Sequence, residues 1–111
     1  MLICEDNPAF AREIAERLTL EGATVLGPFA FVVDAKRALD RHFGKVGAAV
    51  LDWNLADGTV EPIAAILASR NVPFLFCTSD ESQVQGWPGH PVVAKSYIEW
   101  VVPQLATLLC R

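Results

Sequence analysis

The chain has 111 residues, of which 52% are hydrophobic and 20% charged, a composition typical of one globular domain and not of a disordered segment. Its nine Lys and Arg residues against thirteen Asp and Glu residues give a net charge of −4. This balance argues against direct binding to nucleic acid, because phosphate contacts need clustered cations.

The three cysteines are far apart in the chain and form neither a CxxC pair nor a cluster with histidine. This pattern argues against a disulfide framework and against a zinc site. The N-terminus lacks the basic and apolar regions of a signal peptide, and no apolar run is long enough to cross a bilayer. We expect no membrane association and a cytoplasmic location, where the cysteines stay reduced.

The first residues predict a strand followed by a helix. Met1–Cys4 is a short apolar run, and Asn7 followed by Pro8 is typical of a helix cap and a first helical residue. The helix is expected to end near Gly22, because glycine relieves the left-handed conformation at a helix end. Its apolar stripe consists of Phe10, Ile14 and Leu18.

Two more strands and a helix are predicted before residue 52. Ala23–Leu26 reads as a second strand closed by Gly27-Pro28, and Ala48–Leu51 as a third strand buried on both faces. Between them a helix is expected to end near Gly44. Its apolar face consists of Ala35, Ala38, Leu39 and Phe43.

The second half of the chain continues the alternation. In order, it predicts a turn at Gly58, a helix over Glu61–Ser69, a strand over Val72–Cys77, a strand over Pro91–Ala94 and a helix over Tyr97–Cys110. Pro103 is expected to bend the last helix. Residues 79–91 are polar and rich in Gly and Pro, so at most a stub of helix fits there. Five strands alternating with helices predict a three-layer, doubly wound α/β domain over residues 1–111.

The informative residues are those that follow the strands. Glu5-Asp6 follows the first strand, Asp52 the third, Thr78-Ser79 the fourth and Lys95 the fifth. The carboxyl ends of parallel strands meet at one edge of a sheet, so these groups are expected to converge. Three carboxylates in one place need a cation, and hard oxygen ligands suit Mg²⁺. A carboxylate such as Asp52 can attack phosphorus, while Lys95 and Thr78 suit phosphoryl oxygens.

Four segments, EDNP, LDWNLADG, FCTS and VAKS, resemble the receiver domain of two-component response regulators, and the resemblance covers essentially the whole chain. It implies a flavodoxin-like strand order of 2-1-3-4-5. It also implies that Asp52 accepts a phosphoryl group in a Mg²⁺-dependent reaction. The implied metal ligands are Glu5, Asp6, Asp52 and the backbone carbonyl of Asn54, and the other implied catalytic residues are Thr78, the switch hydroxyl, and Lys95, the invariant lysine.

The resemblance also implies the partners. Receivers take the phosphoryl group from a histidine kinase or a histidine phosphotransfer protein and signal through contacts with a downstream protein. They catalyse only their own phosphorylation and dephosphorylation, so the chain is not expected to be an enzyme acting on other substrates.

The sequence departs from the family pattern at three places. Ser96 replaces the proline that usually follows the lysine, Val92 replaces the usual switch aromatic, and the segment between Thr78 and Lys95 is short. These departures motivate an alternative hypothesis, a degenerate receiver that acts as a phosphorylation-independent binding module. A third hypothesis, a phosphohydrolase, is weakened because Asn54 occupies the position where such enzymes place a second aspartate.

The last helix is more apolar than one buried stripe requires. Two interpretations stay open from sequence: a deeply packed helix, or a face for a homodimer or another partner. The residues concerned are Ile98, Trp100, Val101, Val102, Leu105, Leu108 and Leu109.

Overall fold

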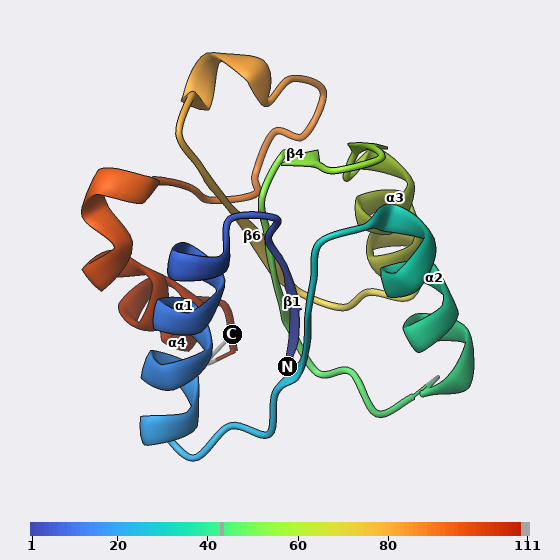
Figure 1. Ribbon diagram of the computed structural model, residues 1–111, viewed down its shortest axis with the longest axis horizontal. Coiled ribbons are helices and arrows are strands. Elements are labelled where there is room, and N and C mark those ends of the chain that lie inside the picture. The colour runs from blue at the N-terminus through green and yellow to red at the C-terminus, as the bar shows by residue number, and fades with distance from the viewer. Residues whose placement is uncertain (43, 110–111) are drawn as a thin grey trace.

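The computed structural model describes residues 1–42 and 44–109, and it contains a five-stranded parallel sheet between two layers of helices (Figure 1). The strands of the sheet are β1 (Leu2–Cys4), β2 (Leu26–Phe29), β3 (Ala49–Leu51), β6 (Phe74–Thr78) and β7 (Val92–Ala94). The helices are α1 (Pro8–Leu20), α2 (Val32–Arg41), α3 (Glu61–Ser69) and α4 (Val101–Leu109). A small hairpin, β4 (Asn54–Leu55) and β5 (Gly58–Thr59), follows β3, and two 3₁₀ segments, η1 (Glu81–Gln83) and η2 (Lys95–Trp100), flank β7. Two residues of the predicted helices, Phe43 and Cys110, lie outside the described ranges.

The strand order is β2-β1-β3-β6-β7, which is 2-1-3-4-5 when the sheet strands are numbered along the chain. Each neighbouring pair is parallel. The predicted fold class and strand order are therefore confirmed. No helix in residues 1–42 or 44–109 is both long and apolar enough to span a membrane.

Alternation along the strands divides the core into two layers, because successive side chains of a strand point to opposite faces. Leu2 and Cys4 of β1 pack with the buried residues of α2 and α3, while Ile3 between them packs with those of α1 and α4. Figure 1 shows the same division, with α1 and α4 on one side of the sheet and α2 and α3 on the other. The continuous apolar runs in the sequence reflect this burial on both faces.

The start of α1 agrees with the prediction. The Oδ1 atom of Asn7 accepts hydrogen bonds from the backbone N–H groups of Ala9 (3.0 Å) and Phe10 (3.3 Å), and Pro8 is the first helical residue. Such a cap satisfies N–H groups that have no partner inside the helix. The cap therefore fixes where α1 begins relative to the end of β1.

The second strand was predicted too early in the chain. It spans Leu26–Phe29 and not Ala23–Leu26, so Gly27 and Pro28 lie inside the strand. A proline is tolerated there because β2 is at the edge of the sheet. Gly27 has φ +104°, and a Cβ atom at this position would lie 2.8 Å from the carbonyl oxygen of Ile3, so only glycine fits.

The predicted bend of the last helix at Pro103 is wrong. The break lies inside η2, at Tyr97, whose backbone is non-helical (φ −117°, ψ 38°). Pro103 falls in the first turn of α4, where a missing N–H costs little. The helix packs deeply through Ile98, Val101, Leu105 and Leu108, whereas Tyr97, Trp100 and Leu109 are exposed.

The segment between β6 and β7 contains only the short η1, as the sequence predicted. Its aromatic residues fold back onto the sheet. The ring of His90 stacks on Phe74 with centroids 4.1 Å apart, and Trp87 meets the ring of Phe74 edge-on at 5.8 Å. Aromatic contacts thus anchor this otherwise irregular segment to β6.

Candidate functional site

The register of β1 and β3 places the first carboxylates side by side. Cys4 pairs with Leu51, so Glu5 and Asp52 leave the sheet at the same level. The backbone N–H of Asp52 donates to the carbonyl oxygen of Cys4 at 2.8 Å, which holds the two strand ends together. Residues far apart in sequence therefore meet at the carboxyl edge of the sheet.

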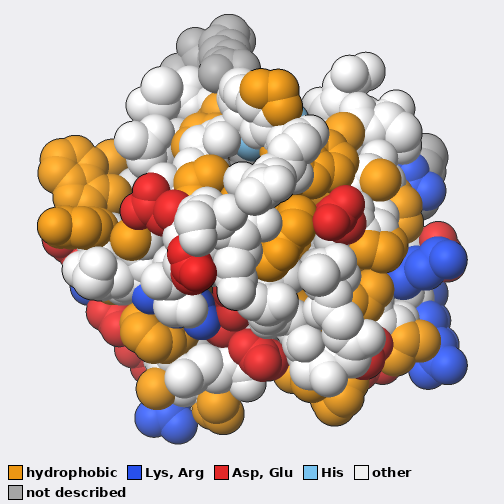
Figure 2. All heavy atoms as spheres, turned by 90° about the horizontal axis from the view of Figure 1, so that it is seen from above, with side chains coloured by type: hydrophobic (Ala, Val, Ile, Leu, Met, Phe, Trp, Pro, Cys, Tyr) orange, Lys and Arg blue, Asp and Glu red, His pale blue; other side chains and the backbone are white. Residues whose placement is uncertain are grey.

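Three carboxylates gather at this edge. Glu5, Asp6 and Asp52 each offer an oxygen, and these oxygens lie within 4.8 Å of one another. Glu5 and Asp52 are buried, while Asp6 is exposed. Figure 2 shows this end of the molecule, with acidic side chains at several places on the face.

Lys95 reaches the same place from β7. Ala94 is the register partner of Thr78, so Lys95 extends one residue beyond the end of β6. Its Nζ atom lies 2.9 Å from Oδ2 of Asp52 and within 2.9–3.0 Å of both carboxylate oxygens of Glu5. One ammonium thus serves two buried carboxylates.

Burial dominates the electrostatics of Glu5. Desolvation, and then the contact with Asp52, raise the pKa of Glu5 to about 7, while Lys95 acts in the opposite direction. For Lys95, burial acts to lower the pKa, but the hydrogen bonds to Glu5 and Asp52 outweigh it and the pKa is raised. The ammonium is therefore held in its charged form beside carboxylates that are crowded in the absence of a further cation.

The carboxylate cluster fits a divalent metal ion. The Oε1 atom of Glu5 is buried and accepts no hydrogen bond from the residues that the structure describes, although the Lys95 ammonium is 2.9 Å away. Lys95 shares its single charge between Glu5 and Asp52, so this oxygen has an ion-pair partner but no hydrogen-bond donor, and a second cation would compensate the remaining negative charge. Carboxylates from Glu5, Asp6 and Asp52 form the kind of all-oxygen set that suits Mg²⁺.

Thr78 and Asn54 lie at or just beyond the carboxyl ends of β6 and β3. Thr78 is buried at the last position of β6, and its Oγ1 accepts a hydrogen bond from the backbone N–H of Asp80 at 3.4 Å. Asn54 is exposed in β4, and its Nδ2 donates to Oε1 of Gln83 at 2.6 Å. The side chain of Asn54 thus ties the hairpin after Asp52 to η1.

Sequence reasoning missed two side chains near this edge. Gln83 gave no signal beyond its polarity. Asp57 precedes Gly58, where a turn was predicted, and its carboxylate caps α2 by accepting from the backbone N–H groups of Val32 (2.5 Å) and Val33 (3.2 Å). The hydrogen bond from Val32, followed by other backbone donors, lowers the pKa of Asp57. Phe31, at the N-cap position of α2, has no side chain that can accept hydrogen bonds from the first N–H groups of the helix. That missing cap was a signal that an acidic residue from elsewhere in the chain could lie there.

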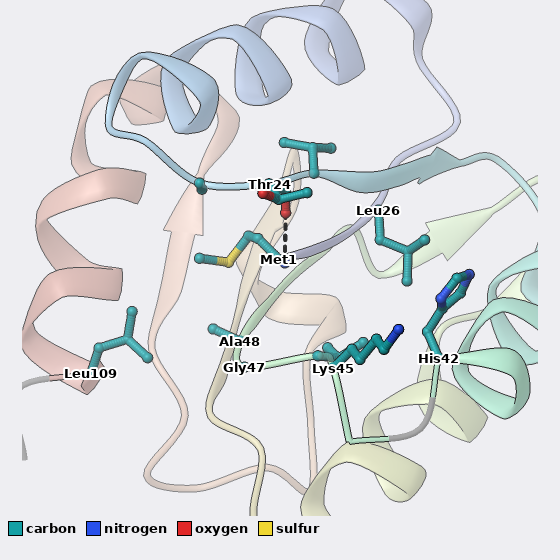
Figure 3. A pocket seen from close by; sticks show the side chains of 11 residues that line it. Met1, Thr24, Leu26, His42, Lys45, Gly47, Ala48 and Leu109 are labelled. Atoms are coloured by element: carbon teal, nitrogen blue, oxygen red, sulfur yellow. Dashed lines mark hydrogen bonds between the residues drawn. The ribbon is translucent and has the colours of Figure 1, made fainter.

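A pocket of about 430 Å³ lies at the other end of the sheet (Figure 3). Met1, Thr24 and Ala48, which precede or lead into the first three strands, line it. The terminal ammonium of Met1 donates to the carbonyl oxygen of Thr24 at 2.9 Å. The pocket is at the amino ends of the strands and takes no part in the carboxylate site.

Solved protein structures share this fold. SdrG from Sphingomonas melonis Fr1 is 33% identical, with 97% of this chain and 93% of that chain covered and a TM-score of 0.83. The response regulator PhyR from Brucella abortus is 24% identical (98% and 46% covered, TM-score 0.82), and the non-phosphorylated receiver domain of HemR from Leptospira biflexa is 20% identical (99% and 93% covered, TM-score 0.82). This chain belongs to the family of response-regulator receiver domains. It spans less than half of the PhyR chain. No model of a protein family matches it, and no curated protein does.

The receiver differs from its family pattern where the sequence indicated. Ser96 follows Lys95 through a trans peptide bond, since the cis bond found among the described residues is Gly27-Pro28. Val92, in place of the switch aromatic, is partly buried on β7. Neither departure disturbs the contact of Lys95 with Asp52.

Proposed function

We propose that this receiver accepts a phosphoryl group on Asp52 from a histidine kinase or a histidine phosphotransfer protein, and signals through contacts with a downstream protein. The observation that carries the proposal is the meeting of three carboxylate oxygens within 4.8 Å with the Lys95 ammonium 2.9 Å from Asp52. Catalysis would be limited to the domain's own phosphorylation and dephosphorylation, in the cytoplasm.

Each residue of the cluster has a role in the proposal. An oxygen of Asp52 forms a bond to phosphorus while the bond between phosphorus and the donor histidine breaks. The ammonium of Lys95, already beside Oδ2 of Asp52, balances charge on the transferred group, and the hydroxyl of Thr78 donates to another phosphoryl oxygen. Glu5, Asp6, Asp52 and the backbone carbonyl of Asn54 would hold Mg²⁺. When bound, Mg²⁺ supplies positive charge that offsets the crowded carboxylates and the phosphoryl oxygens.

A similar structure supports phosphoryl acceptance. SdrG, which is 33% identical in sequence to this chain, is also known in a BeF3-activated conformation, and that structure has a TM-score of 0.76 to this chain. A fluoride complex of this kind has the shape and charge of a phosphoryl group. A relative that is activated by such a group favours the same chemistry at Asp52 over the alternative of a phosphorylation-independent module.

The surface proposed to bind a partner protein is the exposed side of η2 and α4. Tyr97 and Trp100 expose more than half of their surface there, and Leu109 does so at the end of α4. Exposed aromatic residues are enriched at protein interfaces. A downstream protein or a second copy of the chain would bind on this side.

The test is labelling of the purified protein by acetyl phosphate, followed by intact-protein mass spectrometry. With Mg²⁺ present, we expect one phosphoryl group on the wild type, none on Asp52→Asn, and one on the control Asp34→Asn, which changes an exposed aspartate of α2. Removal of Mg²⁺ by a chelator should abolish labelling. Labelling of Asp52→Asn, or no labelling of the wild type, would sink the proposal.

A second measurement separates the proposal from the binding-module alternative. Trp53 is buried and follows Asp52 in the chain, so we expect its fluorescence to respond to Mg²⁺. In a Trp87→Phe, Trp100→Phe background only Trp53 remains. A Mg²⁺ titration that leaves this fluorescence unchanged, together with absent labelling, would favour a module that signals by protein contact alone.

A further inference from the structure

Phe10 contacts the lysine of the site, although its position in the sequence indicates only the apolar stripe of α1. It is the third residue of α1, and its backbone N–H donates to Oδ1 of the cap residue Asn7 at 3.3 Å. The side chain is partly buried beside the core layer formed with α1 and α4. The Nζ atom of Lys95 lies over the Phe10 ring, 4.9 Å from its centroid.

Among residues 1–42 and 44–109, three side chains therefore contact the Lys95 ammonium. The carboxylates of Glu5 and Asp52 accept its hydrogen bonds, and the face of the Phe10 ring covers another side. Only 11% of the Lys95 side chain is exposed. The negative face of an aromatic ring attracts a cation, and the attraction grows when water is excluded.

We propose that Phe10 is a positioning residue for phosphoryl transfer, whose ring holds the Lys95 ammonium beside the Asp52 carboxylate. This inference rests on the proposed function. A lysine side chain has four rotatable methylene groups, and its order is costly. A ring face in contact with the ammonium, together with the two carboxylates, restricts where the ammonium can lie before phosphoryl oxygens arrive. Less of its side-chain entropy then has to be lost during the reaction.

The variants Phe10→Leu and Phe10→Tyr separate the ring from mere packing. Leucine keeps an apolar side chain of useful size but removes the ring face, whereas tyrosine keeps the ring. We expect the rate of labelling by acetyl phosphate at saturating Mg²⁺ to fall about two- to thirtyfold in Phe10→Leu and to stay near the wild-type rate in Phe10→Tyr. The Mg²⁺ affinity, read from Trp53 fluorescence, should be the same in all three proteins.

A second readout does not depend on labelling. The ε-methylene protons of Lys95 should show an upfield ring-current shift in NMR spectra of the wild type and of Phe10→Tyr, and lose it in Phe10→Leu. Equal labelling rates in wild type and Phe10→Leu, or equal losses in Phe10→Leu and Phe10→Tyr, would overturn the positioning role. A wild type that shows the shift but takes no label would instead locate the failure in the proposed function, while the contact itself stands.

Discussion

The Nζ atom of Lys95 lies 2.9 Å from Oδ2 of Asp52, although 43 residues separate them in the chain. The same ammonium also contacts Glu5. Both carboxylates are buried, so this one cation carries most of the charge compensation that the described residues offer. The relationship links the stability of the metal-free domain to the residues proposed for its chemistry.

Replacement of Lys95 by Met should destabilise the metal-free protein. Loss of one partner leaves buried carboxylates without a cation, a change that typically costs roughly 3 kcal/mol. Urea unfolding in a chelating buffer measures the loss. Lys45→Met, at an exposed lysine outside the carboxylate cluster, is the matched control and should change little. Added Mg²⁺ should stabilise Lys95→Met more than the wild type; equal stability of Lys95→Met and wild type without metal contradicts this account.

Replacement of Glu5 by Gln should have the opposite effect on the metal-free protein. The amide keeps the shape of the side chain but removes one of the crowded negative charges, while Lys95 keeps Asp52 as its partner. We expect the free energy of unfolding to rise by about 1 kcal/mol, because residues of functional sites are often less stabilising than the replacements that remove their charge. Mg²⁺ affinity should fall at the same time. A variant that is less stable and binds Mg²⁺ as tightly as the wild type would disprove the prediction.

Removal of the Asp57 cap should weaken the domain in a pH-dependent way. Hydrogen bonds from Val32 and other backbone donors lower the pKa of Asp57 below its unfolded value. A lowered pKa stabilises the folded state above the unfolded pKa of about 3.9, and this stabilisation is lost as pH falls through the folded value. Asp57→Ala should therefore lower the thermal midpoint at pH 7 by a few degrees, with a difference that shrinks below about pH 4. Asp40→Ala, at the other end of α2, should not lower the midpoint; a loss at Asp57 that is constant with pH argues against the charge.

The aromatic anchor of residues 79–91 gives a fourth prediction. Trp87 contacts the rings of Phe74, Phe76 and His90, whereas 54% of Trp100 is exposed. We expect Trp87→Ala to lower the free energy of unfolding by about 2–3 kcal/mol, somewhat less than for a fully buried aromatic, and Trp100→Ala by less than about 1 kcal/mol. Chemical denaturation of the two variants in parallel is the measurement. Equal losses would mean that the segment is held by other contacts.

The predictions from sequence succeeded where signals are local. The cap at Asn7, the helix Glu61–Ser69 and the short helical stub after Thr78 each depend on neighbouring residues, and the structure has all three. The predicted bounds of the second strand were wrong because Gly27-Pro28 is a strong local signal for the end of a strand. In the structure, pairing with β1 at the sheet edge outweighs that signal. The bend predicted at Pro103 is also wrong, because a proline bends a helix only in its interior and α4 begins just two residues earlier, at Val101.

The sequence determined the parallel fold through the order of its apolar runs. It also determined that Glu5, Asp52 and Lys95 meet at one edge, because each follows a strand and parallel strands share the direction of their carboxyl ends. Only the tertiary structure decided which atoms meet there. The ring of Phe10 over Lys95, the bond between Asn54 and Gln83, and the cap of α2 by Asp57 depend on strand register and helix placement, which no stretch of neighbouring residues encodes.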